Sequence, residues 1–291
     1  MGLLLVTRFT LLEALLRRLF LAVVILSALM LAVFAILLSV GMHFLVANNN
    51  SDLSPQLFLL SGGIFIAVMV GWMVYLLSSL LTIVLTAGMI SGEVEAGTFA
   101  VIVPKPLSRA EIVLGKCLGY ALILGVYTAV LFLSFLAVIY WQSGYWPPQV
   151  LRALGILELE TMTLLAITTL GSSLVPTIVN GAIALILFIG APISSVVQFI
   201  VQAISQAQDQ AMQNIAIAIS LVVPTDALWH GTSFYLLPSQ NLFAILGVST
   251  RSFNTPFTSA EPLTAAFLVW AVLYSLILPL LAVLRFQRRD L

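Results

Sequence analysis

The sequence is poor in residues that build metal centres, disulfides and most catalytic sites. Among 291 residues there is one cysteine, Cys117, and there are two histidines, His43 and His230. A single cysteine excludes an internal disulfide and a zinc centre made of thiolates. His230 has Asp226 four residues before it, but a metal site would need a further ligand nearby. Phosphate-loop and nucleophile-elbow motifs are also absent, which argues against ATP binding through such a loop and against an α/β-hydrolase.

Charge is equally scarce. Only 8% of the residues are charged, against about 25% in an ordinary soluble domain, and 62% are hydrophobic. A chain this apolar cannot bury its surface in one water-soluble core. Formal net charge is zero, with 11 basic and 11 acidic side chains, which gives no indication of a nucleic-acid partner. The composition therefore predicts an all-α polytopic membrane protein.

Long apolar runs predict six transmembrane helices, since a spanning helix needs roughly 20 apolar residues. The runs are separated by polar or turn-forming stretches, such as NNNSDLSP at 48–55 and Pro176. The predicted spans are residues 19–46, 57–90, 112–141, 152–175, 177–202 and 263–286.

The basic residues predict the orientation. With the N-terminus inside, nine of the eleven basic residues lie on the cytoplasmic side, and only Arg152 and Arg251 lie outside. Short loops rich in Lys and Arg face the cytoplasm. Both termini and the loop at 91–111 are therefore predicted to be cytoplasmic, in a protein of the cytoplasmic (inner) membrane. The nine residues are Arg8, Arg17, Arg18, Lys105, Arg109, Lys116, Arg285, Arg288 and Arg289.

Two segments outside the spans are also predicted to be helical. In residues 1–18, leucines recur at helical spacing beside Arg8 and Arg17, which favours an amphipathic helix at the inner leaflet over a simple extension of the first span. Residues 203–262 form the largest outer segment. Its run from Ile215 to Val223 is too short to span and predicts a short helix on the outer face. This segment is either an ordered lid or a gate and docking surface for an extracytoplasmic partner.

The stretch from Ser91 to Lys116 holds six of the 22 charged side chains. Glu93 and Glu95 are expected to flank a turn, and Gly97 to break the chain before a short helix over 99–103, with Thr98 as a possible N-cap. Pro104 and Pro106 end that helix. Ser108 and Glu111 form a capping-box pattern before the third span. The pattern predicts a short, rigidly held helix that can carry force between two spans.

These residues resemble the loop of ABC-2 type ABC transporter permeases, which have the type V exporter fold. The resemblance rests on thirteen positions at fixed spacing and on Thr10, Glu13, Arg17 and Arg18 near the start. Glu158, Glu160 and the Pro224–Trp229 stretch are similar to the NosY-like branch. The thirteen positions are Glu93, Gly97, Thr98, Phe99, Pro106, Leu107, Ser108, Arg109, Glu111, Ile112, Leu114, Gly115 and Lys116.

The resemblance implies a transport subunit that is not itself an enzyme. Two permease copies would form the pathway, and separate cytoplasmic ABC ATPase subunits would bind ATP and Mg, so that this chain holds no cofactor. A coupling helix after Gly97 would seat in the ATPase, and Lys116 would snorkel to lipid headgroups. The implied coupling residues are Glu93, Glu95, Gly97, Thr98, Phe99, Ile102, Pro106, Ser108, Arg109 and Glu111.

Glu158 and Glu160 are the carboxylates predicted to lie inside a span. Such groups are costly in a membrane and indicate function by default, so that Glu158 could face the translocation path or the second copy. Alternatively the fourth span begins near Thr161 and both lie at the interface. Apolar spans favour a lipidic or amphipathic substrate for export. The alternatives are a non-transporting complex that transmits force to an extracytoplasmic partner, and an intramembrane enzyme.

Overall fold

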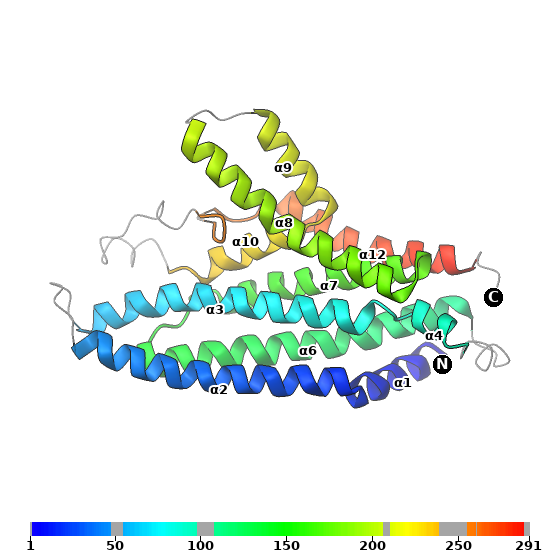
Figure 1. The fold of residues 1–291 in the computed structure, drawn as a ribbon, viewed down its shortest axis with the longest axis horizontal. Coiled ribbons are helices and arrows are strands. Elements are labelled where there is room, and N and C mark those ends of the chain that lie inside the picture. Colours follow the sequence, from blue (N-terminus) through cyan, green and yellow to red (C-terminus); the bar gives the residue numbers. More distant parts are fainter. Residues whose placement is uncertain are drawn as a thin grey trace.

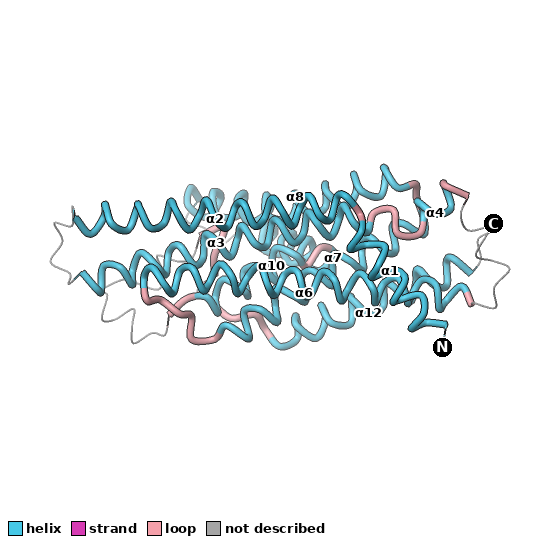
Figure 2. The backbone as a smooth tube through the Cα atoms, turned by 90° about the horizontal axis from the view of Figure 1, so that it is seen from below, coloured by secondary structure: helices cyan, strands magenta, loops and turns pink. Residues whose placement is uncertain are grey.

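The computed structural model describes residues 2–47, 55–97, 108–205, 210–238, 255–259 and 261–287. In these ranges the chain is helical, and its strand-like pairing is one isolated bridge between Thr255 and Thr258. Figure 1 shows the helices as an elongated bundle, and Figure 2 shows that most of them run along a common axis. The helices are α1 (Gly2–Leu16), α2 (Arg18–Ala47), α3 (Pro55–Thr86), α4 (Ser91–Glu95), α6 (Arg109–Ser143), α7 (Val150–Leu174), α8 (Thr177–Ser205), α9 (Gln210–Val222), α10 (Thr225–Leu236) and α12 (Ala265–Gln287).

Five stretches in the described ranges are long and apolar enough to cross a membrane. They are Arg18–Met42, Leu59–Glu95, Arg109–Ser143, Thr177–Val197 and Ala265–Gln287. They match five of the six predicted spans. The predicted fourth span, 152–175, is the helix α7, which is long enough but is not among the candidates. The six-span topology therefore stays a prediction.

Helix α7 differs from the others because it lies inside the bundle. It packs against α3, α6, α8, α10 and α12 (Figure 1). Its buried residues include Glu160 and several threonines and serines. A helix covered by protein on most sides can carry polar side chains, since they meet neighbouring helices rather than lipid. The same polar content lowers its hydropathy.

Polar contacts join α7 to the helices beside it. The Thr86 and Thr168 hydroxyls are 2.7 Å apart. Asn180 Nδ2 donates to the Ala87 carbonyl at 2.7 Å and to the Thr168 carbonyl at 2.9 Å. Between membrane helices the hydrophobic effect supplies little association energy, and such hydrogen bonds and small residues fix the packing.

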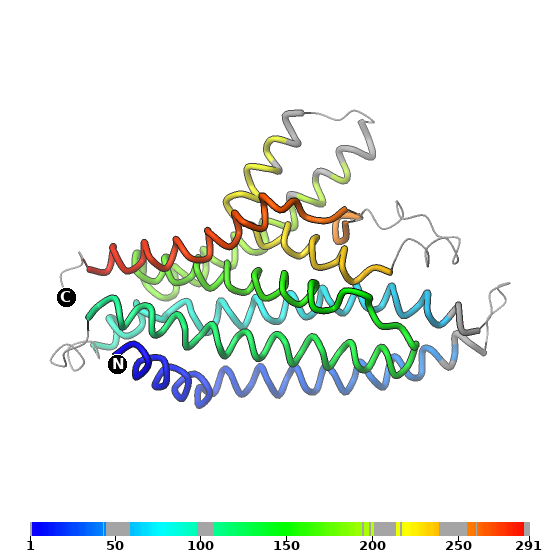
Figure 3. The backbone as a smooth tube through the Cα atoms, turned by 180° about the vertical axis from the view of Figure 1, so that it is seen from behind, coloured from blue at the N-terminus to red at the C-terminus, as the bar shows by residue number. Residues whose placement is uncertain are grey.

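The N-terminal helix is separate from the first span, as predicted, with a break at Arg17. Most of its leucines are exposed, but the opposite face packs along α6 through Thr7, Thr10 and Ala14 (Figure 3). Close approach is possible because α6 has Gly115 and Gly119 there. A Cβ on Gly115 would lie 2.8 Å from Val6 Cβ, and one on Gly119 would lie 2.8 Å from Thr10 Cβ.

The outer segment contains α9 and α10. The run at 215–223 predicted a short helix, and α9 covers residues 210–222. Helix α8 and helix α9 project from the bundle (Figure 1). Helix α10 instead enters the core against α7 and α3. Trp229 is 1% exposed and its ring lies 5.5 Å from that of Tyr75. The α10 part of the segment at 203–262 is therefore part of the hydrophobic core.

Candidate functional site

The acidic residues at the start of the loop lie on a short helix, not around a turn. Helix α4 holds Glu93 and Glu95, so the predicted acidic turn is wrong. Hydrogen bonds from Gly92 to Gly88 and from Val94 to Ile90 continue the chain from α3 into α4. Gly97 follows with φ of 67°, a conformation that glycine adopts without strain. The predicted break at Gly97 is confirmed.

The predicted contact helix itself lies outside the described residues. This applies to four of the predicted coupling residues: Thr98, Phe99, Ile102 and Pro106. The structure describes the two flanks of this segment, which end at Gly97 and resume at Ser108.

On the first flank, Glu93 is bound to α6. Its carboxylate forms an ion pair with the Lys116 ammonium. Lys116 Nζ also donates a hydrogen bond to the Met89 carbonyl at 3.0 Å. The Lys116 side chain is 9% exposed and that of Glu93 is 21% exposed. The prediction that Lys116 reaches lipid headgroups is wrong, because the pairing with Glu93 holds the ammonium inside the protein.

Glu95 binds the start of α8. Its Oε1 accepts a hydrogen bond of 2.9 Å from the backbone N–H of Thr177, the first residue of that helix. The Ser91 and Thr177 hydroxyls are 2.9 Å apart. The first N–H groups of a helix lack partners inside it and carry partial positive charge. A carboxylate therefore stabilises this end of α8 and joins it to α4.

On the second flank, Ser108 caps α6. Glu111 N–H donates to Ser108 Oγ at 3.2 Å, and Ser108 N–H donates to Glu111 Oε2 at 3.0 Å. The predicted capping box is confirmed. Arg109 Nη1 donates to the carbonyls of Phe286 and Gln287 at 3.1 and 3.2 Å, at the end of α12. A cation at a helix C-terminus satisfies carbonyls that have no partner in the helix.

The two flanks of the loop are thus joined to three helices, α6, α8 and α12, which form a frame for it. Its first flank is joined to α6 by Glu93 and to α8 by Glu95, and its second flank is joined to α12 by Arg109. The start of α1 and the end of α12 lie at the same end of the bundle as α4 (Figures 1 and 3). Sequence reasoning assigned these charges to an external partner. It missed Thr177 and the carbonyls of Met89 and Phe286 because main-chain partners leave no signal in residue type.

The two carboxylates of α7 lie against different helices. Glu160 is 0% exposed, and its Oε1 accepts a 2.9 Å hydrogen bond from Ser79 Oγ on α3. Glu158 is partly buried next to Gly125 of α6. Among the described residues, Glu158 Oε1 and Glu160 Oε2 have no hydrogen-bond partner. Sequence reasoning ranked Glu158 above Glu160, whereas Glu160 is the more deeply buried.

The described residues hold no group of three or more His, Cys, Asp or Glu side chains that could bind a metal. His230 Nε2 lies 3.0 Å from the Pro256 carbonyl. The Asp226 carboxylate accepts a hydrogen bond from the Ser195 hydroxyl. Both side chains therefore join α10 to neighbouring segments.

A bundle of long apolar helices with a polar loop anchored at one end defines a multi-pass membrane protein. Comparison with family models assigns it more closely. The model described as ABC-2 family transporter protein matches residues 11–291. The chain belongs to this family, whose members are generally transport subunits without catalytic activity of their own and generally work with cytoplasmic ABC ATPase subunits. A comparison with curated proteins gave no match.

Proposed function

We propose that this chain is the permease subunit of an ABC exporter and that its loop at 91–111 receives force from a separate cytoplasmic ATPase. The observation that carries this is the anchoring of both flanks of the loop to the transmembrane bundle. These anchors join each flank of the loop to helices that are distant in the sequence, so a displacement of the loop acts on them. Membership of the ABC-2 family supports the same reading.

The anchors suggest how a push on the loop spreads. Displacement of α4 acts on α6 through the Glu93–Lys116 ion pair and on α8 through the Glu95–Thr177 hydrogen bond. Displacement of Arg109 acts on α12. Coupling of this kind needs a contiguous set of packed and bonded groups. ATP binding and hydrolysis would thus move several helices together.

The remaining parts of the proposal follow from this role. ATP and Mg would bind to the partner ATPase, and a second copy of the chain, or a related permease, would complete the pathway. The loop and both termini would face the cytoplasm, since the basic residues gather there. Apolar spans favour export of a lipidic or amphipathic compound.

The test targets the loop rather than its anchors. Glu93→Arg is a poor probe, because it would place an arginine against Lys116 and disturb the bundle. Phe99→Asp and Ile102→Asp introduce charge into the segment predicted to contact the ATPase. Both variants should insert and purify normally but lose co-purification with the ATPase and the stimulation of its ATP turnover. Gln149→Asp, exposed at the opposite end of the bundle, is the control. Unchanged co-purification of the Phe99 and Ile102 variants would refute the coupling role.

A further inference from the structure

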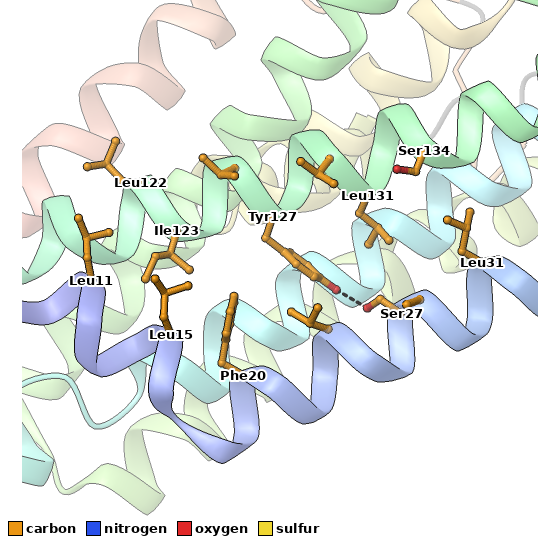
Figure 4. A pocket seen from close by; sticks show the side chains of 14 residues that line it. Leu11, Leu15, Phe20, Ser27, Leu31, Leu122, Ile123, Tyr127, Leu131 and Ser134 are labelled. Carbon is orange, nitrogen blue, oxygen red and sulfur yellow. Dashed lines mark hydrogen bonds between the residues drawn. The ribbon is translucent and has the colours of Figure 1, made fainter.

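An apolar groove lies where the α1–α2 break meets α6. It has a volume of about 580 Å³ and is open on one side. Figure 4 shows its walls: Leu11 and Leu15 come from α1, Phe20 and Leu31 from α2, and Leu122 to Ser134 from α6. The groove exists because the chain bends at Arg17, which moves the start of α2 away from the line that α1 follows along α6.

The interior of the groove offers almost no free polar group. Of the three hydroxyls that line it, two bind each other: Ser27 Oγ and Tyr127 Oη are 2.7 Å apart and bridge α2 to α6 (Figure 4). Ser27 Oγ also donates to the Val23 carbonyl at 2.8 Å. A polar solute would gain nothing from groups that are already satisfied. The groove therefore suits a hydrocarbon.

The groove is about as long as one leaflet is thick, and its α6 wall lies around the middle of the predicted span 112–141. Along α6 it extends over thirteen residues, from Leu122 to Ser134, and the twelve steps of 1.5 Å between them span about 18 Å. One leaflet contributes about half of a hydrocarbon core that is roughly 30 Å thick. The groove is therefore long enough for an extended acyl chain.

Arg8 places a positive charge near the end of the groove that is closest to the loop. Arg8 is exposed and precedes Leu11 by three residues, so it shares the face of α1 that lines the groove. Val6 packs at Gly115 and Thr10 at Gly119, so Arg8 lies beside the part of α6 between these glycines, before the groove begins at Leu122. Among the described residues, Arg8 has no ion-pair partner. An arginine guanidinium recognises phosphate well.

We propose that this groove binds one acyl chain of an inner-leaflet glycerophospholipid, whose phosphate lies at Arg8. The lipid is a resident ligand that fills the space between the α1–α2 bend and α6, distinct from any transported substrate. An acyl chain bound there contacts α1, α2 and α6 at the same time and so stabilises their arrangement. The inference does not depend on the ATPase, and it can fail or hold independently of the coupling role.

Photo-crosslinking tests the site in the full-length protein. The chain is placed in nanodiscs of phosphatidylcholine with a small fraction of phosphatidylglycerol that has a diazirine on its acyl chain. After illumination, mass spectrometry locates the label. Residues 122–134 should be labelled well above the exposed face of α12, which samples bulk lipid. Equal labelling of the two would show bulk lipid only and would overturn the proposal.

Tryptophan substitutions make the test specific. Ala28→Trp fills the groove from within, and Val126→Trp covers it from a side chain that is 64% exposed, so at least the second should leave the core intact. If the introduced indole displaces two methylene groups of the acyl chain from the groove, the affinity of the lipid should fall roughly tenfold. Labelling of 122–134 should fall by about that factor. Leu37→Trp, on an exposed part of α2 beyond the groove, is the matched control and should change nothing.

Two further variants test whether Arg8 binds the lipid phosphate and whether a second copy of the protein covers the groove. Arg8→Gln should reduce labelling by the phosphatidylglycerol probe, and an unchanged result would remove the assigned phosphate contact. In a Cys117→Ser background, Val126→Cys reports on a second copy. An efficient disulfide-linked dimer through this cysteine would show that protein covers the groove and would overturn the lipid assignment.

Discussion

The ion pair between Glu93 and Lys116 is the strongest test of the frame that holds the loop. Lys116→Met keeps the length of the side chain but leaves the Glu93 carboxylate without its ammonium partner. Glu93→Gln removes the carboxylate, so that the largely buried Lys116 ammonium keeps its hydrogen bond to the Met89 carbonyl but loses its ion pair. In the double variant neither charge remains. The double variant should therefore lose less stability than the sum of the losses in the two single variants.

The burial of the pair sets the size of the effect. Removal of one partner from a buried pair costs about 3–5 kcal/mol, because the other charge stays behind without compensation. Glu93 is 21% exposed, which places the expected loss near the lower end, at about 3 kcal/mol. At about 2–4 °C per kcal/mol, the melting temperature should fall by roughly 6–12 °C. The double variant should recover about half of the summed losses or more.

Cys117 provides the assay. It is the single cysteine and is only partly exposed, so a thiol-reactive fluorogenic dye reports unfolding of the purified protein. Far-UV circular dichroism gives a second melting curve that does not depend on a thiol next to Lys116. Glu13→Gln is the control, since the Glu13–Arg17 pair is exposed and should contribute under about 1 kcal/mol. Additive losses, with coupling below about 0.5 kcal/mol, would show that the pair does not hold the loop.

Three further predictions concern other parts of the bundle. Gly115→Leu should push α1 away from α6 and cost about 1–3 kcal/mol, whereas Gly190→Leu, where a Cβ meets nothing within 4 Å, should leave the melting temperature almost unchanged. Asn180→Ala should cost about 1–3 kcal/mol by the same melting assay, because two buried carbonyls lose their donor, and a loss near zero would contradict the role of these bonds. Asp226 lies outside the candidate spans, and burial raises its pKa above 3.8, so the folded state retains a proton that the unfolded state releases and stability falls as the pH rises above about 4. Asp226→Asn should flatten this fall in a pH series of melting curves, and an unchanged slope would exclude Asp226 as its source.

Much of the helical architecture could be predicted because apolar length and breaker residues act locally. Predicted spans agree with α2, α3, α6, α8 and α12 to within a few residues at most ends. The separation of the N-terminal helix from the first span, the capping box at Ser108 and the break at Gly97 were also predicted correctly. Each depends on residues within one or two turns, so the residue types alone were informative.

The position of α7 and α10 could not be predicted in the same way. Helix α7 is too polar to qualify by hydropathy, and α10 comes from a segment expected to cover the outer face. Both lie in the core because other helices surround them and satisfy their polar groups. Glu160, for example, obtains a partner from Ser79, which is 81 residues away in the sequence. Burial of this kind depends on the whole bundle.

By itself the sequence determined the class of the protein, the boundaries of most helices and the place of the polar loop between two of them. Only the tertiary structure decided what the charges of that loop do. Glu93 meets Lys116, Glu95 meets the start of α8, and Arg109 meets the end of α12. The partners of Glu95 and Arg109 are main-chain atoms 82 and 177 or more residues away. Every residue type offers such atoms, so only the packing of the helices could select them.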